Sequence, residues 1–203
     1  ILSQKLSNKD KEAESGYIKM SWNASEISKE MATISVDNKS EVPGYGGVYW
    51  QYFENLDKIT SAETPLKLQK KYFVERNTAN GPVLTPVNEG DELKVGDKIK
   101  VRIELRVDRN MEYVHMKDMR PSCMEPVNVI SQYKWQGGLG YYETTKDAST
   151  NFFFSWLNKG TYVFEYPLFI THAGNYSSGI TSIQCMYAPE FSSHSEGIRI
   201  KTD

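Results

Sequence analysis

The sequence predicts an all-β protein, an antiparallel β-sandwich with a small N-terminal β segment. Apolar and charged residues alternate without interruption from Lys98 to Asp108, as in a strand with one face on a core and one in water. Further apolar stretches are short and separated by turn-forming residues, a spacing typical of sandwiches. No stretch keeps a helical period of 3.6 residues beyond one or two turns.

The larger part of the fold is expected between residues 63 and 203, with seven or eight strands starting at about Leu66. The strand over 98–108 follows the turn residues Gly96-Asp97 and should direct its five apolar side chains inward: Ile99, Val101, Ile103, Leu105 and Val107. Other strands are expected at residues 113–116, 151–154, 161–170, 179–186 and 198–201.

The first 62 residues are expected to form a separate small β segment. Strands are predicted at 17–22, 31–36 and 47–53, with a short helical turn around 25–30. The polar stretch 60–65 ends in a proline and predicts a linker, so the domains are placed at 1–62 and 63–203. Three strands can hardly bury a core of their own, so this segment is expected to pack on something else.

Composition excludes several classes of protein. The 203 residues are 39% hydrophobic and 25% charged, values typical of a folded globular chain. The net charge of -2 excludes a broad electrostatic attraction to nucleic acid or anionic membranes. No apolar stretch approaches the roughly 18–20 residues that span a bilayer, so direct membrane insertion is not expected.

No arrangement of residues predicts catalysis, a metal site or a cofactor. Ser193-His194-Ser195-Glu196 are adjacent, and neighbours on an extended chain point to opposite faces, so a polar loop is favoured over a triad. The three histidines have no metal-ligand spacing. Gly137-Gly138-Leu139-Gly140 lacks the Lys-Ser/Thr of a phosphate loop and predicts a flexible turn. The protein is not expected to be an enzyme.

Two groups of aromatic residues allow two interpretations. Exposed aromatic platforms stack on sugars or bases, whereas large aromatic side chains also fill sandwich cores, and core or inter-domain packing is the favoured interpretation. The groups are Tyr45, Tyr49, Trp50, Tyr52 and Phe53, and Tyr133, Trp135, Tyr141 and Tyr142.

The two cysteines also leave two alternatives open. Cys123 and Cys185 are too few for a disulfide scaffold and lack metal-ligand spacing. They form either two buried thiols or one disulfide that closes a long loop, and the disulfide would need an oxidising compartment.

Several motifs resemble a known family. The residues are Val114-His115-Met116-Lys117-Asp118-Met119-Arg120-Pro121 with Met124-Glu125-Pro126, Tyr141-Tyr142, Lys159-Gly160-Thr161-Tyr162 and Met186-Tyr187-Ala188-Pro189-Glu190-Phe191. In this order they resemble the last macroglobulin-like domain of bacterial alpha-2-macroglobulins, in the version of Bacteroidetes. Upstream, Trp22, residues 32–38 and residues 46–53 resemble the returning part of the family's CUB-type β domain.

The resemblance implies that the chain is a module of a large exported protease trap, located in the periplasm or at the cell surface. The full-length parent protein could then be a lipoprotein. In such traps, cleavage of a bait region exposes a Cys-Gln thioester that captures the protease. Cys123-Met124-Glu125-Pro126 cannot form this thioester, because Pro126 stands where Gln is needed. The expected partners are the thioester and CUB-type domains of the same parent chain and, indirectly, the target proteases.

The resemblance also implies a role for Met186 and Tyr187. The matching Met-Tyr pair of bacterial relatives is implicated in shielding the thioester from water, so these two residues are expected on an accessible loop. The competing interpretation is that Met186 ends a strand and Tyr187 packs inside the sandwich. A different class of function, a ligand-binding sandwich for carbohydrate binding or adhesion, is the alternative to the trap module.

Overall fold

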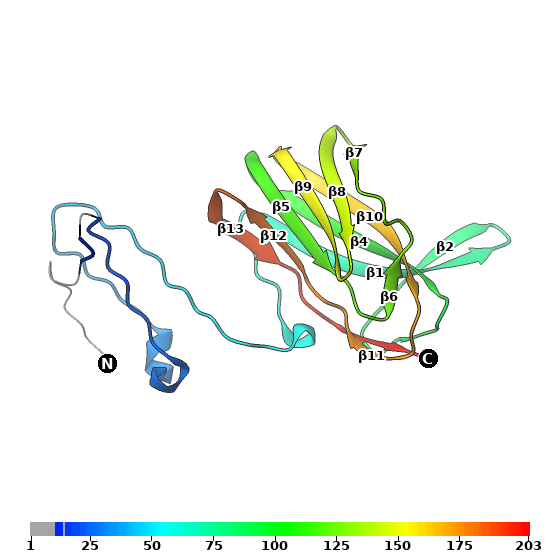
Figure 1. Cartoon of the computed structure of the whole chain (residues 1–203), viewed down its shortest axis with the longest axis horizontal. Helices are drawn as coiled ribbons and strands as arrows, with labels where there is room; N and C mark the ends of the chain where they lie inside the picture. Colours follow the sequence, from blue (N-terminus) through cyan, green and yellow to red (C-terminus); the bar gives the residue numbers. More distant parts are fainter. Residues whose placement is uncertain (1–10, 14) are drawn as a thin grey trace. The chain divides into compact units, whose positions relative to one another are not determined.

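A computed structural model describes residues 11–13 and 15–203 (Figure 1). The chain separates into two units, Ile1–Gln51 and Tyr52–Asp203. The division thus falls about ten residues before the expected boundary at residue 62. Residues 52–62 belong with the second unit, where Ala62 and His194 exchange backbone hydrogen bonds of 3.0 and 3.1 Å. Residues 1–10 and 14 of the predicted N-terminal segment lie outside the described residues.

The described residues of the first unit form two short 3₁₀ helices and no strand. The helices, η2 (Ala24–Glu26) and η3 (Lys29–Ala32), lie close to the helical turn expected around 25–30. The strands predicted at 17–22, 31–36 and 47–53 are wrong. A strand exists only where its backbone N–H and C=O groups pair with a neighbour, and these stretches have no such partner among the described residues.

The second unit is a β-sandwich, as predicted, after one further 3₁₀ helix, η4 (Leu56–Lys58). One sheet has the strand order β2-β1-β4-β10-β6 and the other β13-β12-β5-β9-β8-β7, with all neighbours antiparallel. A small third sheet, β11-β14-β3, contains the parallel pair β14–β3. The strands are β1 (Leu66–Thr78), β2 (Gly81–Pro86), β3 (Glu92–Leu93), β4 (Lys98–Val107), β5 (Met111–Met119), β6 (Met124–Pro126), β7 (Gln132–Gln136), β8 (Leu139–Lys146), β9 (Ser149–Leu157), β10 (Gly160–Ile170), β11 (Gly174–Ser177), β12 (Thr181–Cys185), β13 (Ala188–His194) and β14 (Arg199–Thr202).

The sandwich contains more strands than the seven or eight that the sequence predicted. Every strand that the sequence predicted after residue 97 is present within a few residues of its expected bounds. The additional ones include β3 and β6, which have two and three residues and are too short to show an alternating pattern. Gly137 and Gly138, expected in a flexible turn, form the tight turn between β7 and β8 with φ angles of +57° and +80°.

The core lies between the two large sheets, and β4 is central to it. All five apolar side chains expected to point inward from β4 are buried, as the alternation predicted. On the same strand, Ile103 lies opposite Phe164 of β10 on one side and Lys70 of β1 on the other. Phe152 and Phe154 of β9 reach Phe164 from the other sheet, with ring centroids 5.4 and 5.5 Å away. None of the helices in the described residues is long and apolar enough to cross a membrane.

Candidate functional site

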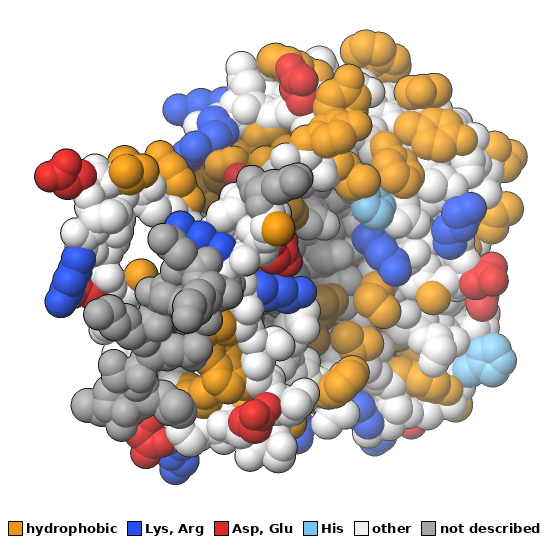
Figure 2. Space-filling model, turned by 60° about the vertical axis from the view of Figure 1, so that its left-hand side comes forward, with side chains coloured by type: hydrophobic (Ala, Val, Ile, Leu, Met, Phe, Trp, Pro, Cys, Tyr) orange, Lys and Arg blue, Asp and Glu red, His pale blue; other side chains and the backbone are white. Residues whose placement is uncertain are grey.

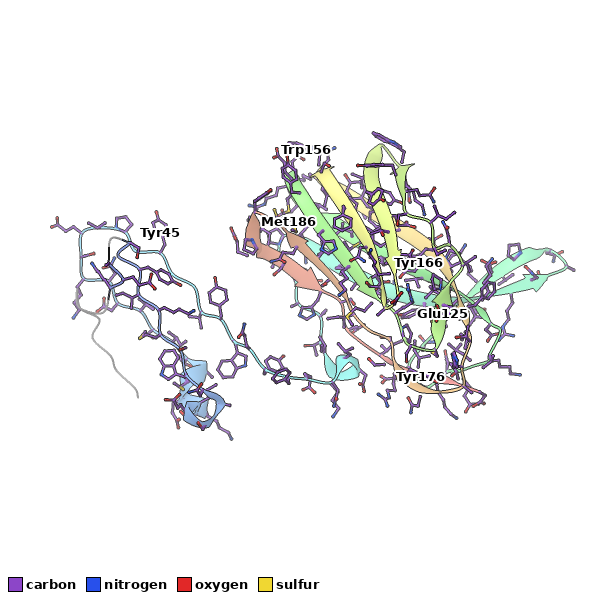
Figure 3. The ribbon with its side chains drawn as sticks, viewed as in Figure 1. Tyr45, Glu125, Trp156, Tyr166, Tyr176 and Met186 are labelled. Atoms are coloured by element: carbon purple, nitrogen blue, oxygen red, sulfur yellow. The ribbon has the colours of Figure 1, made fainter. Side chains whose placement is uncertain are left out.

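The turn between β12 and β13 presents two large side chains to solvent. Cys185 and Ala188 are paired across the hairpin, so Met186 and Tyr187 form a two-residue tip. Met186 is 59% exposed and Tyr187 is 81% exposed. Figure 3 shows Met186 at the end of the sandwich, away from Tyr166, which lies between the sheets. Of the two interpretations for Tyr187, the structure therefore places this residue outside the core.

The hairpin tip is held by the neighbouring strand β5. The Met186 N–H donates a 2.9 Å hydrogen bond to the Tyr113 carbonyl, and the Cys185 thiol donates to the Glu112 carbonyl at 3.3 Å. The Tyr113 and Tyr187 rings meet edge to face with centroids 5.2 Å apart. Tyr113 has a φ of +52°, a left-handed conformation that costs about 1–3 kcal/mol for a non-glycine residue and is often found at functional sites.

This arrangement offers apolar area that can cover a surface. Thioether and phenol side chains provide apolar area, and an aromatic ring buries about 150 Å² or more when a partner covers it. Hydrophobic side chains gather at the upper right of the space-filling view (Figure 2). The exposed hydrophobic residues of the second unit include Trp156 as well as Met186 and Tyr187. Contiguous exposed apolar patches of several hundred Å² are a known feature of protein contact surfaces.

A second notable feature, a buried ion pair, lies between the two sheets. Lys70 of β1 and Asp118 of β5 are 2.6 Å apart, and their side chains are 3% and 0% exposed. Asp118 also accepts hydrogen bonds from the Tyr166 hydroxyl and, at 2.7 Å, from the Thr181 hydroxyl. The Lys70 ammonium donates a further 2.6 Å bond to the Met119 carbonyl. The cluster therefore joins strands β1 and β10 of one sheet to β5 and the start of β12 in the other.

Burial shifts the pKa values of the groups around this pair. Desolvation lowers the pKa of Lys70, and the nearby Asp118 carboxylate opposes that shift. Desolvation, followed by the charge of Asp118, raises the pKa of Tyr166 and of Tyr72 well above the ordinary tyrosine value. Both phenols therefore stay neutral at physiological pH.

The ion pair was not predicted from the sequence, although the sequence contains a signal for it. In β5, Val114, Met116 and Asp118 share one face, and the first two are buried apolar residues. In β1, Lys70 stands at the inward position between Leu68 and Tyr72. A lone charged residue at an inward position of each of two strands predicts a buried pair, because an unpaired buried charge is too costly.

A family model of the bacterial alpha-2-macroglobulin MG10 domain matches residues 66–190. The chain belongs to this family. The match begins at the first residue of β1 and ends within β13, so it includes the buried ion pair and the Met186-Tyr187 tip of the MG10 domain.

Solved structures of bacterial alpha-2-macroglobulins share the fold of this MG10 domain. Escherichia coli alpha-2-macroglobulin activated by porcine elastase matches 70% of the chain with a TM-score of 0.55 and 13% identity. Salmonella alpha-2-macroglobulin reacted with methylamine matches 70% with a TM-score of 0.53 and 14% identity. The chain covers only 14% and 10% of those two structures. A search of curated proteins finds no match.

The two cysteines of the MG10 chain are both free and buried in the structure. Cys185 is paired with Val114 near the start of β5, whereas Cys123 follows the end of β5 at Met119. The two cysteines are therefore placed near opposite ends of β5. Burial raises the pKa of the Cys123 thiol to about 11, which keeps this thiol unreactive.

Ser193 and His194, near the C-terminus, belong to a strand and its hydrogen bonds. Ser193 and His194 end β13, so the expected polar loop is in part a strand. The Ser193 hydroxyl accepts a 2.9 Å hydrogen bond from the Thr64 N–H and donates to the Leu66 carbonyl. The described residues contain no group of His, Cys, Asp and Glu side chains that could hold a metal ion.

Core or inter-domain packing was the favoured interpretation for the two aromatic groups. Only some of their residues lie in the core. Tyr141 is buried and its ring meets Phe164 edge to face at 5.3 Å, as a core residue. Tyr133 and Trp135 are exposed, and so are all five aromatic residues between Tyr45 and Phe53. Figure 3 labels Tyr45 in the first unit, where no described residue is buried.

Proposed function

We propose that this chain is a non-catalytic module of a bacterial alpha-2-macroglobulin-like protease trap. The family match supports a macroglobulin-type module, and a solved relative of the same fold was activated by a protease, porcine elastase. The described residues offer an exposed apolar contact surface at the hairpin tip and a stabilised core, which suit a module that acts by contact with other domains.

Met186 and Tyr187 are proposed to shield the thioester of a neighbouring domain in the parent protein. A thioester is hydrolysed by water, so an uncleaved trap has to keep it dry. The hairpin tip suits this task because its two apolar side chains are exposed while its backbone is fixed to β5 by the Met186–Tyr113 hydrogen bond. A fixed tip loses little conformational freedom when it packs against a partner. This exposed and anchored tip is the observation that carries the proposal.

The proposed partners and location follow from the same role. Residues 1–62 are proposed to be the returning part of a CUB-type domain, and residues 63–203 the last macroglobulin-like domain. The thioester and CUB-type domains of the parent chain are then the direct partners, and target proteases are indirect ones. The parent is proposed to be exported to the periplasm or cell surface, as a protein of the Bacteroidetes type.

The test is the rate of thiol release in the parent protein. In a thioester-bearing parent, Tyr187→Ala should accelerate the appearance of a free thiol in the absence of protease, since water would reach the thioester. Tyr133→Ala is a matched control, because Tyr133 is a similarly exposed tyrosine on the edge strand β7. An unchanged release rate in Tyr187→Ala would remove the shielding role while leaving the family membership intact.

A further inference from the structure

Trp135 lies flat on the outer face of the six-stranded sheet. It is paired across β7 and β8 with Gly140. A Cβ atom added to Gly140 would lie 3.0, 3.2 and 3.2 Å from three consecutive carbons of the indole ring. Three nearly equal distances mean that the ring presents its face, and not its edge, to the glycine backbone. The opposite face of the ring points to solvent, and Trp135 is 81% exposed.

A row of aromatic side chains continues from this point across four strands. Tyr133 is paired with Tyr142, Tyr142 with Phe153, and Phe153 with His115. The Tyr133 and Tyr142 rings are 4.9 Å apart, and the Phe153 and His115 rings stack at 4.6 Å. The row faces outward, because the residues on either side of Phe153, Phe152 and Phe154, are buried in the core. We call these four residues the aromatic row.

Hydrogen-bonding groups border the aromatic row on the same face. The neighbouring row runs through Thr144, Asn151, Lys117 and Ser182, which are paired in that order across β8, β9, β5 and β12. Asn151 connects the rows through a 3.0 Å hydrogen bond to His115. Three exposed side chains on this face can donate hydrogen bonds to a ligand: Lys117, Ser182 and Gln184. Of Lys117, Ser182 and Gln184, only Lys117 carries a formal charge at neutral pH.

We propose that this outer face binds an uncharged polysaccharide, with Trp135 as the stacking platform. A hexopyranose ring has an apolar C–H face and a rim of hydroxyl groups, which match a flat ring and an adjacent polar row respectively. The spacing between strands, about 4.8 Å, is comparable to the length of one sugar unit, so successive units can follow successive strands. Because β7 is the last strand of the sheet, a long chain can continue past Trp135.

The charge and polarity of the face disfavour other ligands. A nucleic acid would need several basic residues to neutralise its phosphates, and the register of the sheet places two lysines on this face, Lys117 and, at the end of β8, Lys146. A packed protein interface would need an apolar centre free of charge, whereas here polar groups lie directly beside the rings. Trp135 lies on β7, at the opposite edge of the six-stranded sheet from the strands β12 and β13 that carry the Met186-Tyr187 tip, so the stacking platform can be tested separately from the proposed trap function.

The test is binding of the 203-residue chain to soluble glycans. Native gel electrophoresis in hydroxyethyl cellulose and calorimetry with N-acetylchitohexaose provide two uncharged β-1,4-linked probes, and alginate provides an anionic one. The chain should be retarded by the uncharged polymer, and Trp135→Ala should lower the affinity by about tenfold or more, as for other aromatic stacking contacts. Gly140→Ala should also weaken binding, since the added methyl group would lift the indole from its position.

Phe169→Ala is the matched control. Phe169 is also an exposed aromatic residue, but it lies on β10 of the other sheet, so its removal should leave binding unchanged. Far-ultraviolet circular dichroism verifies that each variant is folded. The proposal is overturned if the wild-type chain binds neither uncharged probe, if Trp135→Ala binds as well as the wild type, or if only alginate binds and salt abolishes that binding.

Discussion

Removing the Asp118 carboxylate should destabilise the MG10 sandwich more than almost any other polar substitution. The structure gives the reason, since Asp118 is fully buried and neutralises Lys70, which is 3% exposed. In Asp118→Ala the ammonium group would be left without a counter-charge, and the hydroxyl groups of Tyr166 and Thr181 would lose their acceptor. Breaking a buried pair on one side costs about 3–5 kcal/mol.

Urea unfolding followed by circular dichroism measures this cost. With a slope of about 2 kcal/mol per molar urea, the midpoint should fall by about 2 M. The matched control is the exposed pair Lys71–Glu104, which joins the residue next to Lys70 on β1 to β4 with a separation of 3.9 Å. Lys71→Ala should cost about 1 kcal/mol or less, because exposed ion pairs contribute little.

A double-mutant cycle separates the pair from its surroundings. Lys70→Met combined with Asp118→Leu should cost much less than the two single substitutions added together, because no charge is then left buried. If Asp118→Ala does not fold, Asp118→Asn retains the side-chain volume and serves in its place. The reasoning is refuted if the buried-pair variants lose no more stability than Lys71→Ala.

Three further predictions concern the core and its titrating groups. Ile103→Ala should lower the free energy of unfolding by about 2–5 kcal/mol, because Ile103 is fully buried at the centre of β4, and a cost near zero in urea unfolding would contradict its packing. In protein produced in the periplasm, Cys123 and Cys185 should resist iodoacetamide when folded and both be alkylated in denaturant, whereas a mass two hydrogens below that of the dithiol chain would reveal a disulfide. Burial raises the pKa of Tyr141 from 10.0 to about 12, so between these pH values the unfolded chain loses this proton while the folded chain keeps it. The free energy of unfolding should therefore fall as the pH rises from 10 to 12, and the fall should be shallower in Tyr141→Phe than in the wild type, as measured by urea unfolding at several pH values.

The sequence alone predicted the sandwich and the inward face of its central strand. The period of two from Lys98 to Asp108 is a local property of the backbone, and it determines which side chains share a face whatever the partner is. The same local reasoning failed at 17–22, 31–36 and 47–53, because apolar stretches become strands only when a second strand completes their hydrogen bonds. That partner is not visible in the stretch itself.

The tertiary structure decided which of the two faces of each strand is covered and which groups meet. Lys70 and Asp118 are 48 residues apart, and only the packing of one sheet on the other brings them to 2.6 Å. Tyr141 and Tyr142 are neighbours in sequence, yet one fills the core and the other joins the aromatic row, because adjacent residues of a strand point to opposite sides. The resemblance of short motifs indicated the family from sequence, whereas the exposure of Met186 and Tyr187 depended on the two-residue turn that closes the β12–β13 hairpin. Local periodicity thus determines how a strand divides its side chains between two faces, and long-range packing determines what each face contacts.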